Sequence, residues 1–123
     1  MSNGFKVLVV DDDLDNQAII SALLNFSKIE FDLANNGQQA LELIDGHSYN
    51  IVLMDIMMPV MGGLEATACI RAMGEPKSST PIFAVSYRRD LAAKAQWKAQ
   101  GLNGFLTKPF TSESLLSLLD RYR

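Results

Sequence analysis

The chain has 123 residues, of which 48% are hydrophobic and 20% charged, a composition that fits one compact domain and excludes a disordered segment. It carries 11 Lys and Arg against 14 Asp and Glu, and the net charge of −3 gives no basic excess for binding nucleic acid or an anionic membrane. A single cysteine excludes an internal disulfide, and no apolar run approaches the roughly 20 residues of a membrane span.

The first half of the chain alternates between predicted strands and helices. A strand is predicted over 5–10, where FKVLVV is almost continuously apolar, as in a strand buried on both faces. A helix over 14–26, a weaker strand over 29–33 and a helix over 38–44 follow, the last after an Asn-Asn-Gly turn signal. The first of these helices is indicated by residues at four-residue spacing, namely Leu14, Ala18, Ala22 and Phe26.

The second half continues the same alternation. Three more short apolar runs predict strands, which cover 51–54, 82–85 and 105–107. Each is followed by a predicted helix, and these helices cover 64–73, 90–100 and 111–121. Pro59 and the pair Gly62-Gly63 keep the loop before the first of them from becoming helical.

Five strands alternating with five helices predict an α/β protein with a doubly wound, five-stranded parallel sheet covered on both faces. In such sheets, ligands bind beyond the carboxyl ends of the strands. The residues that directly follow the strands are therefore the candidates for a functional site.

Polar residues stand at the ends of four predicted strands. Asp11, Asp12 and Asp13 follow the first strand, Asp55 the third, Ser86 the fourth, and Lys108 the fifth. A parallel sheet would bring them to one edge, where carboxylates repel one another unless a cation binds. Oxygen ligands and a few waters suit Mg²⁺, and a lysine suits a phosphate or a carboxylate.

Each of these residues also has a simpler interpretation. Asp12 or Asp13 could cap the first helix, Asp55 could be a turn residue, and Lys108 could be a solvated surface lysine. Their occurrence at the same end of successive strands favours a shared site.

Four segments resemble the receiver domains of two-component response regulators. They are VLVVDDD (7–13), IVLMDIMMPVMGG (51–63), PIFAVS (81–86) and GFLTKPF (104–110). The resemblance covers nearly the full length. It implies a single-domain receiver over residues 1–123, with a flavodoxin-like three-layer sandwich and the strand order 2-1-3-4-5.

The resemblance also implies a signalling function. Asp55 would accept a phosphoryl group from a histidine kinase or a histidine phosphotransfer protein. Mg²⁺ would be bound by Asp11, Asp12, Asp55 and the backbone carbonyl of Met57. The domain would catalyse its own phosphorylation and dephosphorylation, with no separate substrate to turn over. Because the N-terminus lacks a secretory signal, we expect a cytoplasmic location.

In the same family pattern, Lys108 is the phosphate-binding lysine, Ser86 the switch hydroxyl and Phe105 the switch aromatic. The peptide bond before Pro109 is expected to be cis. Phosphorylation would alter the surface formed by the fourth helix, the fifth strand and the fifth helix, through which a homodimer could form. For Phe105, an ordinary core aromatic is the simpler alternative.

Three other functions share this architecture or part of this chemistry. A flavodoxin-like nucleotide binder would need a Gly/Ser/Thr-rich phosphate loop where this chain has Asp11-Asp12-Asp13. A haloacid-dehalogenase-type phosphatase would need a second Asp at the position of Met57. A receiver-like protein-binding module that is not phosphorylated stays open as an alternative. The kinase, the output, the oligomeric state and whether the domain is free-standing or part of a hybrid kinase also stay open.

One residue departs from the family pattern beside the expected site. Tyr87 follows Ser86, where receivers more often have alanine. We hypothesise that its ring partly covers the phosphorylation site and slows the loss of the phosphoryl group.

Overall fold

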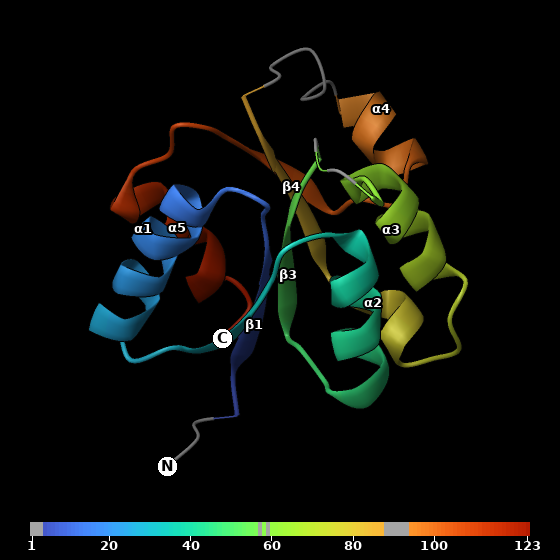
Figure 1. Ribbon diagram of the computed structural model, residues 1–123, viewed down its shortest axis with the longest axis horizontal. Coiled ribbons are helices and arrows are strands. Elements are labelled where there is room, and N and C mark those ends of the chain that lie inside the picture. The colour runs from blue at the N-terminus through green and yellow to red at the C-terminus, as the bar shows by residue number, and fades with distance from the viewer. Residues whose placement is uncertain (1–3, 57, 59, 88–93) are drawn as a thin grey trace.

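Figure 1 shows a computed structural model of the chain, in which residues 4–56, 58, 60–87 and 94–123 are described. The strands are β1 (Lys6–Val10), β2 (Glu30–Ala34), β3 (Ile51–Asp55), β4 (Ile82–Ser86) and β5 (Gly104–Thr107). The helices are α1 (Leu14–Phe26), α2 (Gly37–Gly46), α3 (Gly63–Arg71), α4 (Lys94–Ala99), α5 (Ser112–Asp120) and the short 3₁₀ helix η1 (Lys77–Ser79). Among the described residues, no helix combines the length and apolar character that crossing a bilayer requires.

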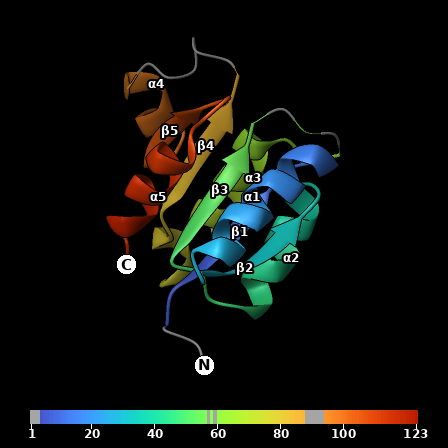
Figure 2. The same ribbon diagram turned by 90° about the vertical axis from the view of Figure 1, so that its left-hand side faces the viewer.

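The strands form one sheet in the order β2-β1-β3-β4-β5, and every neighbouring pair is parallel. Helices α1 and α5 cover one face, whereas α2, α3 and α4 cover the other (Figures 1 and 2). The predicted fold class, including the strand order, is confirmed. Because all the strands run the same way, their carboxyl ends lie along a single edge of the sheet.

The core consists of two apolar layers, one on each face of the sheet. Alternate residues of β1 belong to different layers. Leu8 and Val10 pack towards α2 and α3, and Val7 and Val9 pack towards α1 and α5. This arrangement explains the continuous apolar run FKVLVV, because a central strand has no face in water.

The element bounds differ slightly from the predictions. Strand β2 lies one residue later than 29–33, and α2 begins at Gly37 because the side chain of Asn36 accepts a hydrogen bond from the amide of Gln39 at 2.9 Å. The 3₁₀ helix η1 was not predicted from the sequence. Of the helix predicted over 90–100, α4 is described from Lys94, and residues 90–93 lie outside the described part of the chain.

Helix α1 has the predicted bounds, but the residues that indicated it face outward. The side chains that α1 buries are Gln17, Ile20 and Leu24. The exposed stripe consists of Leu14, Ala18, Ile19, Ala22 and Phe26, and we call it the outer face of α1. Leu14 is 72% exposed, Ile19 56% and Phe26 89%. Four-residue spacing therefore identified the helix but not the side that meets the sheet, because a second set of residues at helical spacing packs there instead.

Helix α3 begins in tight contact with the end of β3. Gly63 is its first residue, and the amide of Gly63 donates a hydrogen bond to the carbonyl of Ile56 at 3.1 Å. A Cβ atom on residue 63 would lie 2.2 Å from the backbone oxygen of Asp55 and 2.9 Å from the Cα of Ile56. Backbone atoms cannot swing aside as a side chain can, so glycine is what allows α3 to start here, packed against the backbone of Asp55.

Replacing this glycine is expected to loosen the packing. Gly63→Ala should lower the free energy of unfolding by about 1–3 kcal/mol, the usual cost of an extra methyl in a packed interior. The matched control is Gly46→Ala at the end of α2, where a Cβ would meet nothing within 4 Å. The control should be neutral or stabilising by up to about 1 kcal/mol, because alanine favours helix. Urea unfolding measures both, and equal effects would contradict the close packing of α3 on β3.

Candidate metal centre

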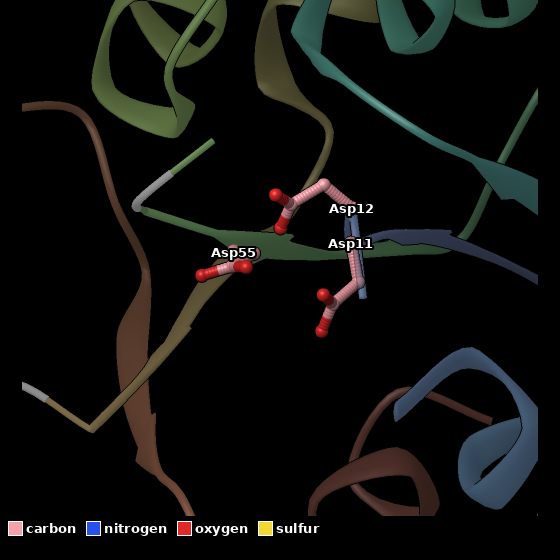
Figure 3. Close-up of side chains that lie close together, drawn as sticks. All are labelled: Asp11, Asp12 and Asp55. Atoms are coloured by element: carbon pink, nitrogen blue, oxygen red, sulfur yellow. The ribbon is translucent and has the colours of Figure 1, made fainter. Parts of the chain in front are cut away.

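Three carboxylates converge beyond the carboxyl ends of β1 and β3. Asp11 and Asp12 follow β1, and Asp55 is the last residue of β3 (Figure 3). Each offers one oxygen, and these three oxygens all lie within 4.8 Å of one another. Asp11 and Asp55 are buried, whereas Asp12 is exposed to solvent. The predicted convergence of Asp11, Asp12 and Asp55 is therefore present in the structure.

A buried lysine completes the cluster. The Nζ atom of Lys108 lies 2.9 Å from Oδ2 of Asp11 and 3.6 Å from Oδ2 of Asp55. Burial alone would lower the pKa of Lys108, but the hydrogen bond to Asp11 and the negative charges of Asp55 and Asp11 outweigh it, so the pKa is raised. The ammonium group consequently stays charged throughout the physiological range. The solvated lysine that the sequence left open as an alternative is excluded.

The backbone around Lys108 is anchored to the neighbouring strand. The amide of Lys108 donates to the carbonyl of Ser86 at 2.8 Å, which continues the pairing of β4 with β5. The Lys108–Pro109 peptide bond is cis, as the family resemblance implies. Ser86 is buried at the end of β4 and lines the same cleft as Asp55.

Asp11 is held in place by backbone and side-chain hydrogen bonds. Its amide donates to the carbonyl of Ala34 at 3.0 Å, and its carboxylate accepts from the amide of Asp13 at 2.9 Å. The amide group of the Gln17 side chain donates to the backbone carbonyl of Asp11 at 2.6 Å and to Oδ1 of Asn35 at 2.7 Å. Gln17 was not predicted. Its signal in the sequence is a polar residue on the same helical face as the buried residues of α1.

Asp13 caps helix α1, as the simpler interpretation of the acidic run allowed. Its carboxylate accepts from the amide of Asp15 at 2.9 Å and from that of Asn16 at 3.4 Å. Asp13 and Asn16 also line an open cleft of about 230 Å³ at this edge of the sheet. The other residues that line the cleft are Asp12, Asp55, Ser86, Tyr87 and Lys108.

Two further predicted residues are not among the described residues that line this cleft. Phe105 is half-buried on β5 and packs against the apolar layer that α2 and α3 cover. It also borders a groove of about 520 Å³ beside α5. Met57, whose carbonyl is the remaining predicted magnesium ligand, lies outside the described residues.

The donor set fits a hard divalent cation. If Asp11, Asp12 and Asp55 are all ionised, three negative charges face the single positive charge of Lys108, a formal charge of −2 for these four groups. Carboxylate oxygens are the ligands that Mg²⁺ prefers, and one ion would balance the excess. The exposed position of Asp12 leaves room for the waters that Mg²⁺ usually retains.

A parallel sheet in this order, with acidic strand ends facing a buried lysine, defines the receiver class of signalling domains. The family model of the response regulator receiver domain matches residues 7–120 of this chain. The chain belongs to this family and is a receiver domain of two-component or phosphorelay signalling.

Curated relatives include a response regulator and a much longer hybrid histidine kinase. Two-component response regulator 24 of Arabidopsis thaliana is 39% identical over 115 residues, which cover 93% of this chain and 81% of that protein. Hybrid signal transduction histidine kinase B of Dictyostelium discoideum is 34% identical over 95% of this chain, but the match spans 6% of the kinase. The chain therefore corresponds to most of one relative and to a small part of the other.

Solved structures share the fold closely. The receiver domain of sensor histidine kinase PA1611 from Pseudomonas aeruginosa PAO1 has a TM-score of 0.87 and 32% identity, with 97% of each chain covered, and holds a magnesium ion in its active site cleft. The co-crystal structure of Ypd1, a histidine phosphotransfer protein, with the receiver domain of Ssk1 from Saccharomyces cerevisiae gives a TM-score of 0.85 and 28% identity. That match covers 96% of this chain and 88% of the other.

The substitution Asp12→Asn distinguishes two effects on stability, namely the repulsion between the clustered carboxylates and the stabilisation by a bound metal ion. Without Mg²⁺, the variant should be as stable as the native chain or more so, because it removes one charge from the cluster. With Mg²⁺ at tenfold its dissociation constant, the native chain should gain about 1.4 kcal/mol, and the variant should lose most of that gain. Urea unfolding with and without Mg²⁺ measures both effects.

The control for this experiment is Asp45→Asn, which removes an exposed carboxylate at the end of α2. It should keep the full stabilisation by Mg²⁺. If Asp12→Asn also kept it, Asp12 would not be a ligand.

Proposed function

We propose that this receiver domain is a phosphorylation-dependent switch in which Asp55 accepts a phosphoryl group from a histidine kinase or a histidine phosphotransfer protein in the presence of Mg²⁺. The observation that carries the proposal is the position of Asp55: buried at the end of β3, yet lining an open cleft, with the Lys108 ammonium 3.6 Å away. We also propose a cytoplasmic location, consistent with a single cysteine that forms no disulfide.

The arrangement suits phosphoryl transfer. A carboxylate is a weak nucleophile, but the transition state at phosphorus is loose, so positioning and charge neutralisation supply most of the catalysis. An oxygen of Asp55 would form the new bond to phosphorus while the bond from phosphorus to the donor nitrogen breaks, and that nitrogen keeps the electron pair. Lys108 would stabilise the phosphoryl oxygens during transfer. A bound Mg²⁺, held by Asp11, Asp12, Asp55 and the carbonyl of Met57, would supply further positive charge.

The new phosphoryl oxygens would also start the conformational change. Ser86 lines the same cleft as Asp55, so its hydroxyl group would donate a hydrogen bond to one of these oxygens. A hydrogen bond to a charged group contributes roughly 1.5–3 kcal/mol, which corresponds to a shift of roughly 10- to 150-fold between two states. The half-buried Phe105 on β5 would then move inward and alter the surface formed by α4, β5 and α5. We propose the same surface for a homodimer.

Intact-mass spectrometry tests the assignment of Asp55. After incubation with a small phosphodonor and Mg²⁺, the native chain should gain the mass of one phosphoryl group, and Asp55→Asn should gain none because an amide is not a nucleophile. Asp120→Asn, on the exposed end of α5, is the matched control and should be phosphorylated like the native chain. Absence of uptake by the native chain would favour the alternative, a protein-binding module that is not phosphorylated.

The outer face of α1 is proposed as the surface that binds the phosphodonor protein. It starts at Leu14, directly after Asp13, which lines the cleft, and it continues to Phe26 at the far end of the helix. A partner that brings a phosphohistidine to Asp55 would therefore cover this stripe as well. Exposed apolar side chains of this size are typical of protein-binding surfaces.

Ile19→Asp tests the docking surface. The donor is chosen by screening histidine kinases and phosphotransfer proteins of the source organism for transfer to the native chain. The variant should slow this transfer by about tenfold or more, because a charge is placed inside an apolar interface. Uptake from a small phosphodonor should not change.

Ser48→Asp is the control, since it adds the same charge at an exposed position away from α1. It should leave both reactions unaffected. If Ile19→Asp slowed phosphoryl transfer equally from the small donor and from the protein donor, the substitution would disturb the site itself. The docking proposal would then fail.

A further inference from the structure

Tyr87 is the aromatic member of an otherwise polar cleft. It directly follows the last residue of β4, and its side chain is 64% exposed. Among the described residues that line the cleft, every other side chain is a carboxylate, an amide, a hydroxyl or an ammonium group. A ring this exposed contributes little to the core, and Tyr87 instead forms part of the wall of the cleft.

The ring contacts the same ammonium group that neighbours the carboxylates. The Nζ atom of Lys108 lies 5.6 Å from the centroid of the Tyr87 ring, within the range of a cation–π interaction. The same Nζ atom lies 3.6 Å from Asp55. The ring and the Asp55 carboxylate therefore flank one cation, and a phosphoryl group on Asp55 would extend into the cleft that the ring borders.

We propose that the Tyr87 ring is a positioning residue that prolongs the phosphorylated state of Asp55, an inference that rests on the function proposed above. Hydrolysis requires a water molecule to approach phosphorus in line with the bond to Asp55. Water oxygen then bonds to phosphorus, the Asp55 oxygen leaves with the electron pair as a carboxylate, and inorganic phosphate is released with the protons of water. The ring restricts that approach by occupying one side of the cleft, and its contact with the Lys108 ammonium keeps the ring in that place.

The test follows the loss of the phosphoryl group in three proteins. The native chain, Tyr87→Ala and Tyr87→Phe are phosphorylated with a small phosphodonor and Mg²⁺, freed of the donor, and followed by intact-mass spectrometry. Tyr87→Ala should lose the group about two- to fivefold faster, the rate equivalent of an exposed cation–π contact. Tyr87→Phe keeps the ring and removes the hydroxyl, so it should restore the native lifetime. A merely structural role would show as altered thermal unfolding of Tyr87→Ala, which is measured alongside.

The outcomes separate the two proposals. If the native chain and Tyr87→Ala both take up phosphate and lose it at the same rate, the role of Tyr87 is overturned and the function of Asp55 stands. If Tyr87→Phe loses phosphate as fast as Tyr87→Ala, the ring is not the barrier and the proposal is likewise overturned. If the native chain takes up no phosphate, the proposed function fails and this inference fails with it.

Discussion

Electrostatic repulsion between carboxylates is the constraint on which the rest of this structure depends. Asp11, Asp12 and Asp55 present oxygens within 4.8 Å of one another, and two of the three side chains are buried. Two like charges 4 Å apart near a protein surface repel by roughly 4 kcal/mol. Lys108 offsets part of this cost through its contacts with Asp11 and Asp55, and a divalent cation would offset the remainder. A domain that needed only stability would gain by removing one of these carboxylates, so their presence indicates a functional site.

The fold holds these like charges together through its backbone. Parallel strands bring the end of β1 beside the end of β3, because Val10 pairs with Met54 in the register of the sheet. On the far side, β4 places Ser86 where its carbonyl accepts from the amide of Lys108. Helix α3 packs directly on the backbone of Asp55 through Gly63. These backbone contacts do not depend on the charge state of the site, so the fold would persist whether the proposed cation is bound or released.

Much of this architecture could be predicted from the sequence, because its signals are local. Continuous apolar runs such as FKVLVV identify strands buried on both faces, and parallel strands necessarily bring their terminal Asp and Lys residues to one edge. The family motifs at 7–13, 51–63, 81–86 and 104–110 then identified the domain, and the match over 7–120 confirms it.

Other features depend on packing between distant segments and could not be predicted. The four-residue spacing in α1 suits a helix with either face inward, and only the packing of Ile20 and Leu24 on the sheet selects the buried face. The pair Gly62-Gly63 is typical of a loop that is not helical, whereas Gly63 is the first residue of α3 and is required there by the proximity of the Asp55 backbone. Gln17 has no sequence motif, because its role comes from the backbone carbonyl of Asp11 and the side chain of Asn35.

The most direct measurement is a high-resolution crystal structure of the chain grown with Mg²⁺. The account predicts one ion in the cleft, bound by carboxylate oxygens of Asp11, Asp12 and Asp55 and by the carbonyl oxygen of Met57 at about 2.1 Å, with water in the remaining positions. Lys108 should stay beside Asp11 and Asp55. A cleft without an ion at a saturating Mg²⁺ concentration, or an ion bound only elsewhere on the surface, would contradict the claim that these carboxylates form a cation site.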